Sequence, residues 1–203
     1  MNAGRTDDGA SLIELILYIV VLGILITGLS MTFINMWLTQ ERVDAQTQAT
    51  THGQLVSSEV EKAMRNAAGF KVIDAGSTLL VETSFSGAQK CQAFHFDPAG
   101  GVEGQGTLHM VLAPAPAPAP SAGYAWQDGI APHTDVVFSK LFTRVNATGS
   151  PVAEAAIDGV GVHYSFAAKA SDPGTEIGPV VFTGTAFARN STLGSTTTCW
   201  PSL

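Results

Sequence analysis

The chain has 203 residues, of which 45% are hydrophobic, and a formal net charge of -7 at pH 7. This length suits one modest globular domain plus one long apolar element, and not two full domains. Only 13% of the residues are charged, and the acidic balance disfavours direct nucleic-acid binding, which needs clustered Lys and Arg.

An uncharged apolar run dominates the N-terminal part of the chain. From Leu15 to Leu38 it reads LILYIVVLGILITGLSMTFINMWL, which is 24 residues. A membrane-spanning helix needs about 20 residues, whereas the apolar core of a cleaved secretory signal peptide has about 7–15. No small-residue cleavage site follows the run. We therefore predict a single-pass membrane helix.

The junction that precedes this run carries a recognisable motif. The chain begins MNAGRTDDG and continues Ala10-Ser11-Leu12-Ile13-Glu14-Leu15. This junction resembles the type IV prepilin family, whose processing site is a Gly before a small or aromatic residue, followed by a T/S-L-I-E-L-like stretch. The resemblance implies that prepilin peptidase removes a leader, residues 1–9, after Gly9. Ala10 then becomes the N-methylated first residue, and Glu14 the fifth.

Glu14 also stands out on physical grounds. A carboxylate at the edge of a membrane span costs free energy unless it is paired, so its presence there predicts a functional role for Glu14. Its natural partner is the α-amino group created at Ala10. Within one helix the two lie about 6 Å apart at 1.5 Å per residue, so pairing between staggered neighbouring subunits is easier. The resemblance implies this pairing, with Glu14 setting the register of the incoming subunit; the alternative is a glutamate in the headgroup region of an ordinary signal anchor.

Helix-compatible sequence continues beyond the membrane run. Residues 10–38 form the predicted membrane and filament-core helix, and residues 39–69 an amphipathic continuation that ends near Ala68 with Gly69 as its cap. Glu61 and Arg65 have the spacing of an exposed helical ion pair. The apolar stripe at three- and four-residue spacing comprises Val56, Val60, Ala63, Met64 and Ala67. The ending EVEKAMRNA resembles the PilW/PulJ-like group of minor pilins and pseudopilins.

Short β-like segments separated by Gly, Pro, Asp and Ser fill residues 70–203, the predicted head domain. We expect strands near Phe70–Asp74, Leu79–Ser84, Cys91–Phe96, Leu108–Leu112, Asp135–Leu141, Val160–Phe166 and Val180–Ala188. A long helix followed by strands predicts an α+β fold, with an antiparallel sheet packed on the apolar stripe of the helix. The pilin resemblance implies the same fold.

The segment Ala113–Pro120 reads APAPAPAP and lacks an N–H at alternate residues, so it cannot be a central strand. We interpret it as an exposed spacer or loop in polyproline II geometry, in preference to a recognition ligand. The aromatic residues Tyr124 and Trp126 just beyond it could dock this loop back onto the sheet.

The two cysteines, Cys91 and Cys199, form no CxxC motif, so the sequence suggests neither a zinc site nor a thioredoxin-like site. If the head lies outside the cytoplasm they can pair. Closing a loop of that length would stabilise the fold by about 4–5 kcal/mol on the chain-entropy model. The alternative is two reduced thiols.

We find no sequence motif for catalysis or cofactor binding. Five histidines, at positions 52, 95, 109, 133 and 163, are scattered singly, without an HExxH or a Cys/His cluster. His95, between Phe94 and Phe96, is interpreted as a strand residue in preference to a metal ligand. The sequence therefore predicts a non-enzyme without a cofactor.

These features together predict a structural subunit of a type IV pilus, competence pilus or type II secretion pseudopilus. The length and helix ending favour a minor subunit, with a major pilin as the runner-up. Expected partners are prepilin peptidase, other pilin or pseudopilin subunits and the inner-membrane assembly platform. The expected location is the cytoplasmic membrane with the head outside, and then the filament. A signal-anchored surface binding domain that never polymerises is the alternative class.

Overall fold

A computed structural model describes residues 12–85, 88–98, 105–135, 137–154, 159–169, 178–189 and 198–201. The chain divides into two compact units, Met1–Val43 and Asp44–Leu203. The first unit contains the N-terminal part of helix α1, and the second holds the rest of α1 and all the strands. The leader residues 1–9, together with Ala10, lie outside the described residues.

Helix α1 runs from Leu12 to Arg65, and its 54 residues correspond to about 80 Å at 1.5 Å per residue. It ends a few residues before the predicted Ala68, because Asn66 forms the turn and its side-chain amide donates to the Lys62 carbonyl at 2.9 Å. The predicted cap at Gly69 is wrong. Gly69 is a buried residue of the first strand, beside a register shift.

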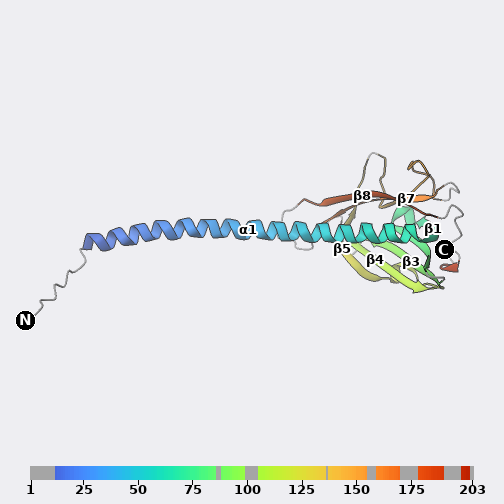
Figure 1. The fold of residues 1–203 in the computed structure, drawn as a ribbon, viewed down its shortest axis with the longest axis horizontal. Helices are drawn as coiled ribbons and strands as arrows, with labels where there is room; N and C mark the ends of the chain where they lie inside the picture. The colour runs from blue at the N-terminus through green and yellow to red at the C-terminus, as the bar shows by residue number, and fades with distance from the viewer. Residues whose placement is uncertain are drawn as a thin grey trace, which may run out of the picture. The chain divides into compact units, whose positions relative to one another are not determined.

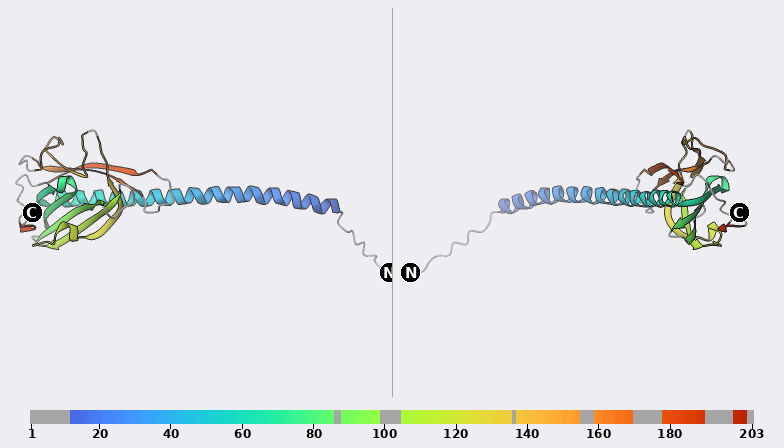
Figure 2. Two further views of the ribbon diagram at one scale, coloured as in Figure 1. Left: turned by 180° about the vertical axis from the view of Figure 1, so that it is seen from behind. Right: turned by 45° about the vertical axis from the view of Figure 1, so that its right-hand side comes forward.

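Eight strands form one antiparallel sheet. They are β1 (Ala67–Ile73), β2 (Thr78–Phe85), β3 (Ala88–Asp97), β4 (Gly106–Pro114), β5 (Tyr124–Pro132), β6 (Phe142–Val145), β7 (Gly161–Ala168) and β8 (Val180–Phe187). The order is β1-β2-β3-β4-β5-β7-β6, with β8 also paired to β7. β3 to β5 lie on one side of the C-terminal part of α1, and β7 and β8 lie on another (Figures 1 and 2). The predicted α+β fold is confirmed.

Six of the seven predicted strands are present, within a few residues at each end. The strand predicted at Asp135–Leu141 is wrong: the described part of that segment is irregular, and strand β6 begins only at Phe142. The Asp135 N–H donates to the Phe138 carbonyl at 2.8 Å in a local turn, and not to a neighbouring strand. Phe138 then stacks on His163 with ring centroids 3.6 Å apart. Strand β5 was not predicted.

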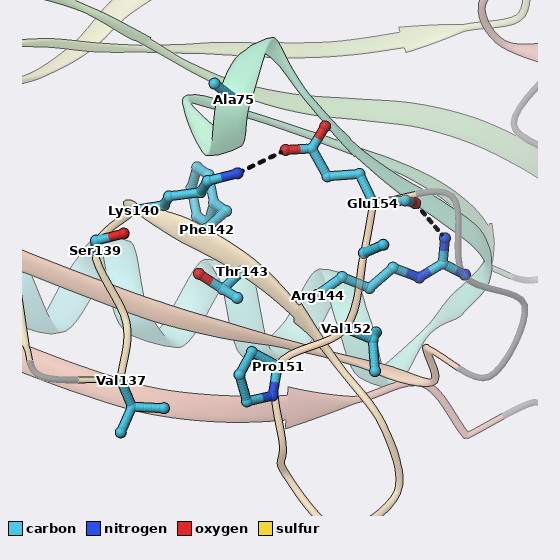
Figure 3. A pocket seen from close by; sticks show the side chains of 11 residues that line it. Ala75, Val137, Ser139, Lys140, Phe142, Thr143, Arg144, Pro151, Val152 and Glu154 are labelled. Atoms are coloured by element: carbon cyan, nitrogen blue, oxygen red, sulfur yellow. Dashed lines mark hydrogen bonds and ion pairs between the residues drawn. The ribbon is translucent and has the colours of Figure 1, made fainter.

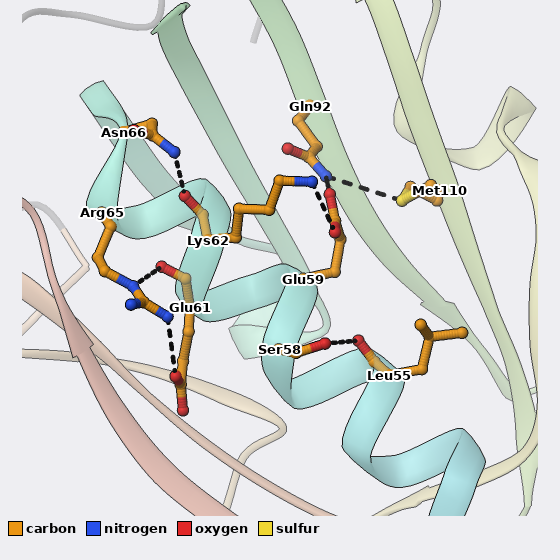
Figure 4. Close-up of polar contacts among 9 residues, drawn as sticks. All are labelled: Leu55, Ser58, Glu59, Glu61, Lys62, Arg65, Asn66, Gln92 and Met110. Atoms are coloured by element: carbon orange, nitrogen blue, oxygen red, sulfur yellow. Dashed lines mark hydrogen bonds and ion pairs between the residues drawn. The ribbon is translucent and has the colours of Figure 1, made fainter.

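The helix and the sheet share one apolar core. The predicted stripe is buried, but only Val56, Val60, Ala63 and Met64 lie on α1; Ala67 belongs to β1, because the helix ends at Arg65. The stripe meets the inner face of the sheet, which contributes Phe94, Phe142 and Phe166. Two hydrogen bonds fasten the polar flanks of the helix to the sheet. Tyr164 Oη donates to Glu61 Oε1 at 2.9 Å. Gln92 Nε2 donates to Glu59 Oε1 at 3.0 Å (Figure 4).

Polar contacts on the helix refine the predicted surface. The predicted exposed pair of Glu61 and Arg65 is present at 3.4 Å. Glu61 additionally accepts the Tyr164 hydroxyl, so it connects the helix surface to the sheet. Burial, and then the neighbouring Glu61 carboxylate, raise the pKa of Tyr164. The hydroxyl therefore stays protonated and available as the donor.

Gly53 on α1 lies close against Phe182 of β8. A Cβ atom at this buried glycine would lie 2.0 Å from Cε2 of Phe182, whose ring stacks on Phe166. We expect Gly53→Ala to lower the free energy of unfolding of the Asp44–Leu203 unit by about 1–3 kcal/mol, because overpacking outweighs the helix propensity of alanine. Urea unfolding of the full chain in detergent measures it.

Gly23→Ala is the matched control, because a Cβ atom at Gly23 would have nothing within 4 Å. The same chemical change there should leave the unfolding of the Asp44–Leu203 unit unaltered. Equal stability of the Gly53→Ala variant and the wild type would contradict the close packing of Phe182 on the helix.

A second apolar cluster covers the outer face of the sheet. It contains Leu80, Cys91, Ala93, Val111, Cys199 and Trp200. Cys91 on β3 forms a disulfide with Cys199, so the predicted pairing is confirmed. The bond holds residues 198–201, here called the C-terminal strap, against the sheet.

The C-terminal strap also fixes the Ala-Pro segment. Ala113 and Pro114 complete β4, the Ala117 N–H donates to the Cys199 carbonyl at 2.9 Å, and Trp200 Nε1 donates to the Pro118 carbonyl at 3.0 Å. Ala115 and Ala117 pack on the outer cluster while Pro116 and Pro118 face solvent. The segment is therefore a docked part of the domain, and the predicted exposed spacer is wrong.

The aromatic residues that the sequence suggested as docking groups have other positions. Tyr124 and Trp126 belong to β5, and Tyr124 is exposed. Trp126 packs against Phe94 with ring centroids 5.9 Å apart. Trp200, and not this pair, anchors the Ala-Pro segment.

Glu82 is buried on the outer face, directly opposite Cys91 in the β2–β3 register, and its Oε2 has no hydrogen-bond partner among the described residues. Burial raises its pKa. The folded state therefore holds the Glu82 proton more tightly than the unfolded state, so this residue lowers stability as pH rises above about 4.3, the unperturbed value.

We expect Glu82→Gln to stabilise the Asp44–Leu203 unit at pH 7 by about 1 kcal/mol, because a buried, unpartnered charged oxygen is removed. At pH 4 and below, where Glu82 is largely protonated in both states of the wild type, the gain should vanish. Urea unfolding at the two pH values measures it, and a gain independent of pH would show that the charge of Glu82 is not its cause.

Candidate functional site

The first unit presents a long apolar surface. Every residue of α1 from Leu12 to Asp44 is exposed, and apolar side chains such as Leu12 and Met36 are 76% and 71% exposed. A soluble monomer rarely exposes an apolar patch above a few hundred Å². Helix α1 is long and apolar enough to cross a membrane, by length and composition. This surface is therefore suited to single-pass anchoring in a membrane.

The hydroxyl side chains of three residues within the apolar run are hydrogen-bonded to their own helix. The hydroxyls of Thr27, Ser30 and Thr32 donate to the carbonyls of Gly23, Ile26 and Leu29, each at 2.8 Å. Such bonds remove the need for water or a polar neighbour. These hydroxyls therefore do not prevent burial of the helix in an apolar environment.

Glu14 differs from these hydroxyls, because its carboxylate can still accept hydrogen bonds or pair with a cation. It lies in the first turn of α1, where the helix dipole favours a negative charge. Its Oε1 accepts one long hydrogen bond, 3.4 Å from the Tyr18 hydroxyl, and both residues are exposed. Within the part of the chain that the structure describes, no cation pairs with it. Gly9 and Ala10, the predicted cleavage residues, lie outside that part.

The other end of the apolar run carries a feature that the sequence reading missed. Trp37 Nε1 donates to Glu41 Oε1 at 2.8 Å, and Phe33 packs edge-on against the Trp37 ring at 6.3 Å. Tryptophan with an apolar body and a hydrogen-bonded N–H is typical of the membrane–water interface. The sequence signal that could have predicted this feature is the position of Trp37 at the end of the apolar run, four residues before the acidic residue Glu41.

A large open cavity of about 720 Å³ lies in the second unit, between β6 and the segment Pro151–Glu154. Its charged side chains are engaged with the protein itself (Figure 3). Lys140 pairs with Glu154 at 3.0 Å, and Arg144 donates to the carbonyls of Glu154 and Gly159 at 2.9 and 3.0 Å. These contacts shape the cavity wall and leave no convergent set of free charges in it.

No group of three or more His, Cys, Asp or Glu side chains that could hold a metal ion occurs among the described residues. His95 is a half-buried residue of β3, as predicted. Of the predicted site residues that the structure describes, it brings together Cys91 and Cys199, and it places Glu14 on α1 apart from them.

No family model, curated protein or solved structure matches this chain. The class that the molecule itself defines is an α+β protein with one long apolar N-terminal helix packed against an antiparallel sheet, the arrangement of a pilin-like fold. The head carries a disulfide, and the helix is suited to single-pass membrane anchoring.

Proposed function

We propose that this protein is a structural subunit of a type IV pilus, competence pilus or type II secretion pseudopilus. The observation that carries the proposal is the combination in the first unit of a fully exposed apolar helix with a single carboxylate, Glu14, at its N-terminal edge. A membrane anchor needs only the apolar surface. A packed filament also needs a device that sets the register of each helix.

In this proposal prepilin peptidase cleaves after Gly9, and the new N-terminus at Ala10 is methylated. The subunit waits in the cytoplasmic membrane with its head outside, where the Cys91–Cys199 bond is stable. At the assembly platform the helix passes from lipid into a bundle of equivalent apolar helices. Glu14 then pairs with the α-amino group at Ala10 of a neighbouring subunit, because an unpaired carboxylate there is costly.

Cleavage is the step to test first. Sequencing the N-terminus of the membrane-bound protein, in cells with active prepilin peptidase, should give Ala10 as the first residue. An intact Met1 there would contradict the filament proposal and favour the alternative, a signal-anchored surface domain. The open cavity beside β6 is the observation that would suit such a binding domain.

Abundance separates a minor subunit from a major one. We expect the protein to be a small fraction of sheared filaments, at or near an end, because the helix ending resembles minor pilins and pseudopilins. Quantifying it against the most abundant filament protein measures this. If it were itself the dominant component, the minor assignment would be wrong and the major-pilin alternative would hold.

A further inference from the structure

Two histidines that the sequence shows 14 residues apart lie directly opposite each other on the outer face of the sheet. His95 on β3 pairs with His109 on β4 in the strand register, and their ring centroids are 6.4 Å apart. Both side chains are half-buried, and His95 lines a pocket of about 270 Å³ beside Trp200 of the C-terminal strap. Solvent and ions can therefore reach this pair.

Hydrogen bonds define the tautomer of His95. The Thr78 hydroxyl donates to Asp74 Oδ2 at 2.7 Å, and Thr78 Oγ1 also lies 2.7 Å from His95 Nδ1. The single hydroxyl proton is used on the carboxylate, so His95 Nδ1 must carry the proton and donate it. The lone pair of the neutral ring is then on Nε2.

His109 has the same tautomer for a different reason. Its Nδ1 lies 2.9 Å from the Gly123 carbonyl, which can only accept. Neither Nε2 atom has a hydrogen-bond partner in the described part of the chain. The Nδ1–H of His109 is thus held by a carbonyl, and that of His95 by a hydroxyl that is itself bonded to a carboxylate. A histidine that binds a metal ion is typically held by such a hydrogen bond on its other ring nitrogen.

The positions of the two hydrogen-bond partners also orient the rings. In the strand order β2-β3-β4-β5, the partner of His95, Thr78, is on β2, and the partner of His109, Gly123, immediately precedes β5. The two Nδ1 atoms therefore face away from each other, toward opposite neighbouring strands. Nδ1 and Nε2 point about 144° apart around an imidazole ring. Both Nε2 atoms are therefore directed back toward the space between β3 and β4.

The geometry points to a site at which His95 Nε2 and His109 Nε2 bind one late first-row transition-metal ion, such as Zn²⁺ or Cu²⁺, with water completing its coordination. Neutral imidazole suits these ions. Metal–nitrogen bonds of about 2.0–2.1 Å in tetrahedral geometry put two ring centroids about 5 Å apart. Binding draws the observed rings together by about 1 Å, which small side-chain rotations supply. The inference does not depend on the proposed filament function.

The test is titration of the full chain in detergent micelles with Zn²⁺ alone, followed by Cu²⁺ alone. We expect one ion per chain, with Cu²⁺ bound more tightly than Zn²⁺. His95→Asn and His109→Asn keep an N–H donor close to the position of Nδ1 but remove Nε2. Each should weaken Zn²⁺ binding at least tenfold.

His163→Asn is the matched control. His163 is also a strand histidine whose Nδ1 contacts a threonine hydroxyl, Thr185 at 3.0 Å, but its strand partners are Thr143 and Thr185, not a histidine. Its replacement should leave Zn²⁺ affinity unchanged. Wild-type affinity in either His95→Asn or His109→Asn, or an equal loss in His163→Asn, would overturn the site.

Nitrogen NMR of the wild-type chain tests the site without any variant. Zn²⁺ should shift the Nε2 signals of two histidines while their Nδ1–H protons are retained. Equal shifts of all five histidines, or no shift, would show that the ion binds elsewhere or not at all.

Discussion

Glu14→Ala is expected to enter the membrane and to lose its leader normally, and yet to reach filaments at a level at least about tenfold below the wild type. Insertion depends on the apolar run, which is unchanged, and cleavage acts at Gly9. Incorporation depends on a charge pair that forms as the helix leaves lipid. Removing one member of a buried, hydrogen-bonded charge pair typically costs about 2–5 kcal/mol, because the other charge is left unpaired.

The measurement is the amount of protein in sheared filaments relative to the membrane fraction, in cells that make the other subunits normally. Glu14→Gln keeps the shape and removes the charge, so it should behave like Glu14→Ala. Glu41→Ala is the control on the same helix, since Glu41 pairs with Trp37 at the other end of the apolar run. Unchanged incorporation of Glu14→Ala would remove this carboxylate from the assembly mechanism.

The long-range plan of the fold was predictable because its signals are local and strong. The apolar run and the stripe that includes Val56 and Val60 fix the two parts of α1 from side-chain period alone. In β7, the alternation of Val162, Tyr164 and Phe166 with Gly161, His163 and Ser165 indicates a strand, but the expected wetter face is wrong, because Gly161 and Ser165 are also buried. Packing an antiparallel sheet against the helix is then the simplest way to bury both the apolar stripe of α1 and the apolar side chains of the strands.

The errors arose where tertiary contacts decide the conformation. Strand β5 contains Asp128 and a glycine, Gly129, at a φ of 72°, and irregular pairing with β4 tolerates both. The Ala-Pro segment looked like a spacer because its composition favours an extended, solvated chain. Ala115 and Ala117 instead pack against the outer cluster that contains Trp200, which lies 80 or more residues away in sequence.

The candidate sites divide in the same way. Glu14 could be singled out from the sequence because of its contrast with adjacent residues, and its role stays a prediction. The pairing of Cys91 with Cys199 was predicted from the expected location of the head outside the cytoplasm. The structure adds that this disulfide holds the C-terminal strap and, through the strap, the Ala-Pro segment. The opposition of His95 and His109 was not predictable, since it depends on the exact register of β3 and β4.

Loss of the disulfide is expected to be the most damaging change within the head. Cys91 and Cys199 are separated by 108 residues, and the chain-entropy model gives about 4–5 kcal/mol for a loop of that length. A single domain typically has about 5–15 kcal/mol in total, so Cys91→Ala and Cys199→Ala should each leave the head marginally stable. Urea unfolding of the full chain in detergent, followed by near-ultraviolet circular dichroism, measures the loss.

The double variant Cys91→Ala/Cys199→Ala separates the crosslink from side effects of a free thiol. It should be about as unstable as either single variant, because all three lack the same bond. Trp200→Ala, with the disulfide intact, removes the indole that donates to Pro118 and belongs to the cluster on which Ala115 and Ala117 pack. This variant should cost less, about 3 kcal/mol, since the unfolded chain is still crosslinked. If the double variant were as stable as the wild type, the C-terminal strap would be held by Trp200 alone. The order of losses therefore distinguishes a strap fixed mainly by covalent linkage from one fixed mainly by packing.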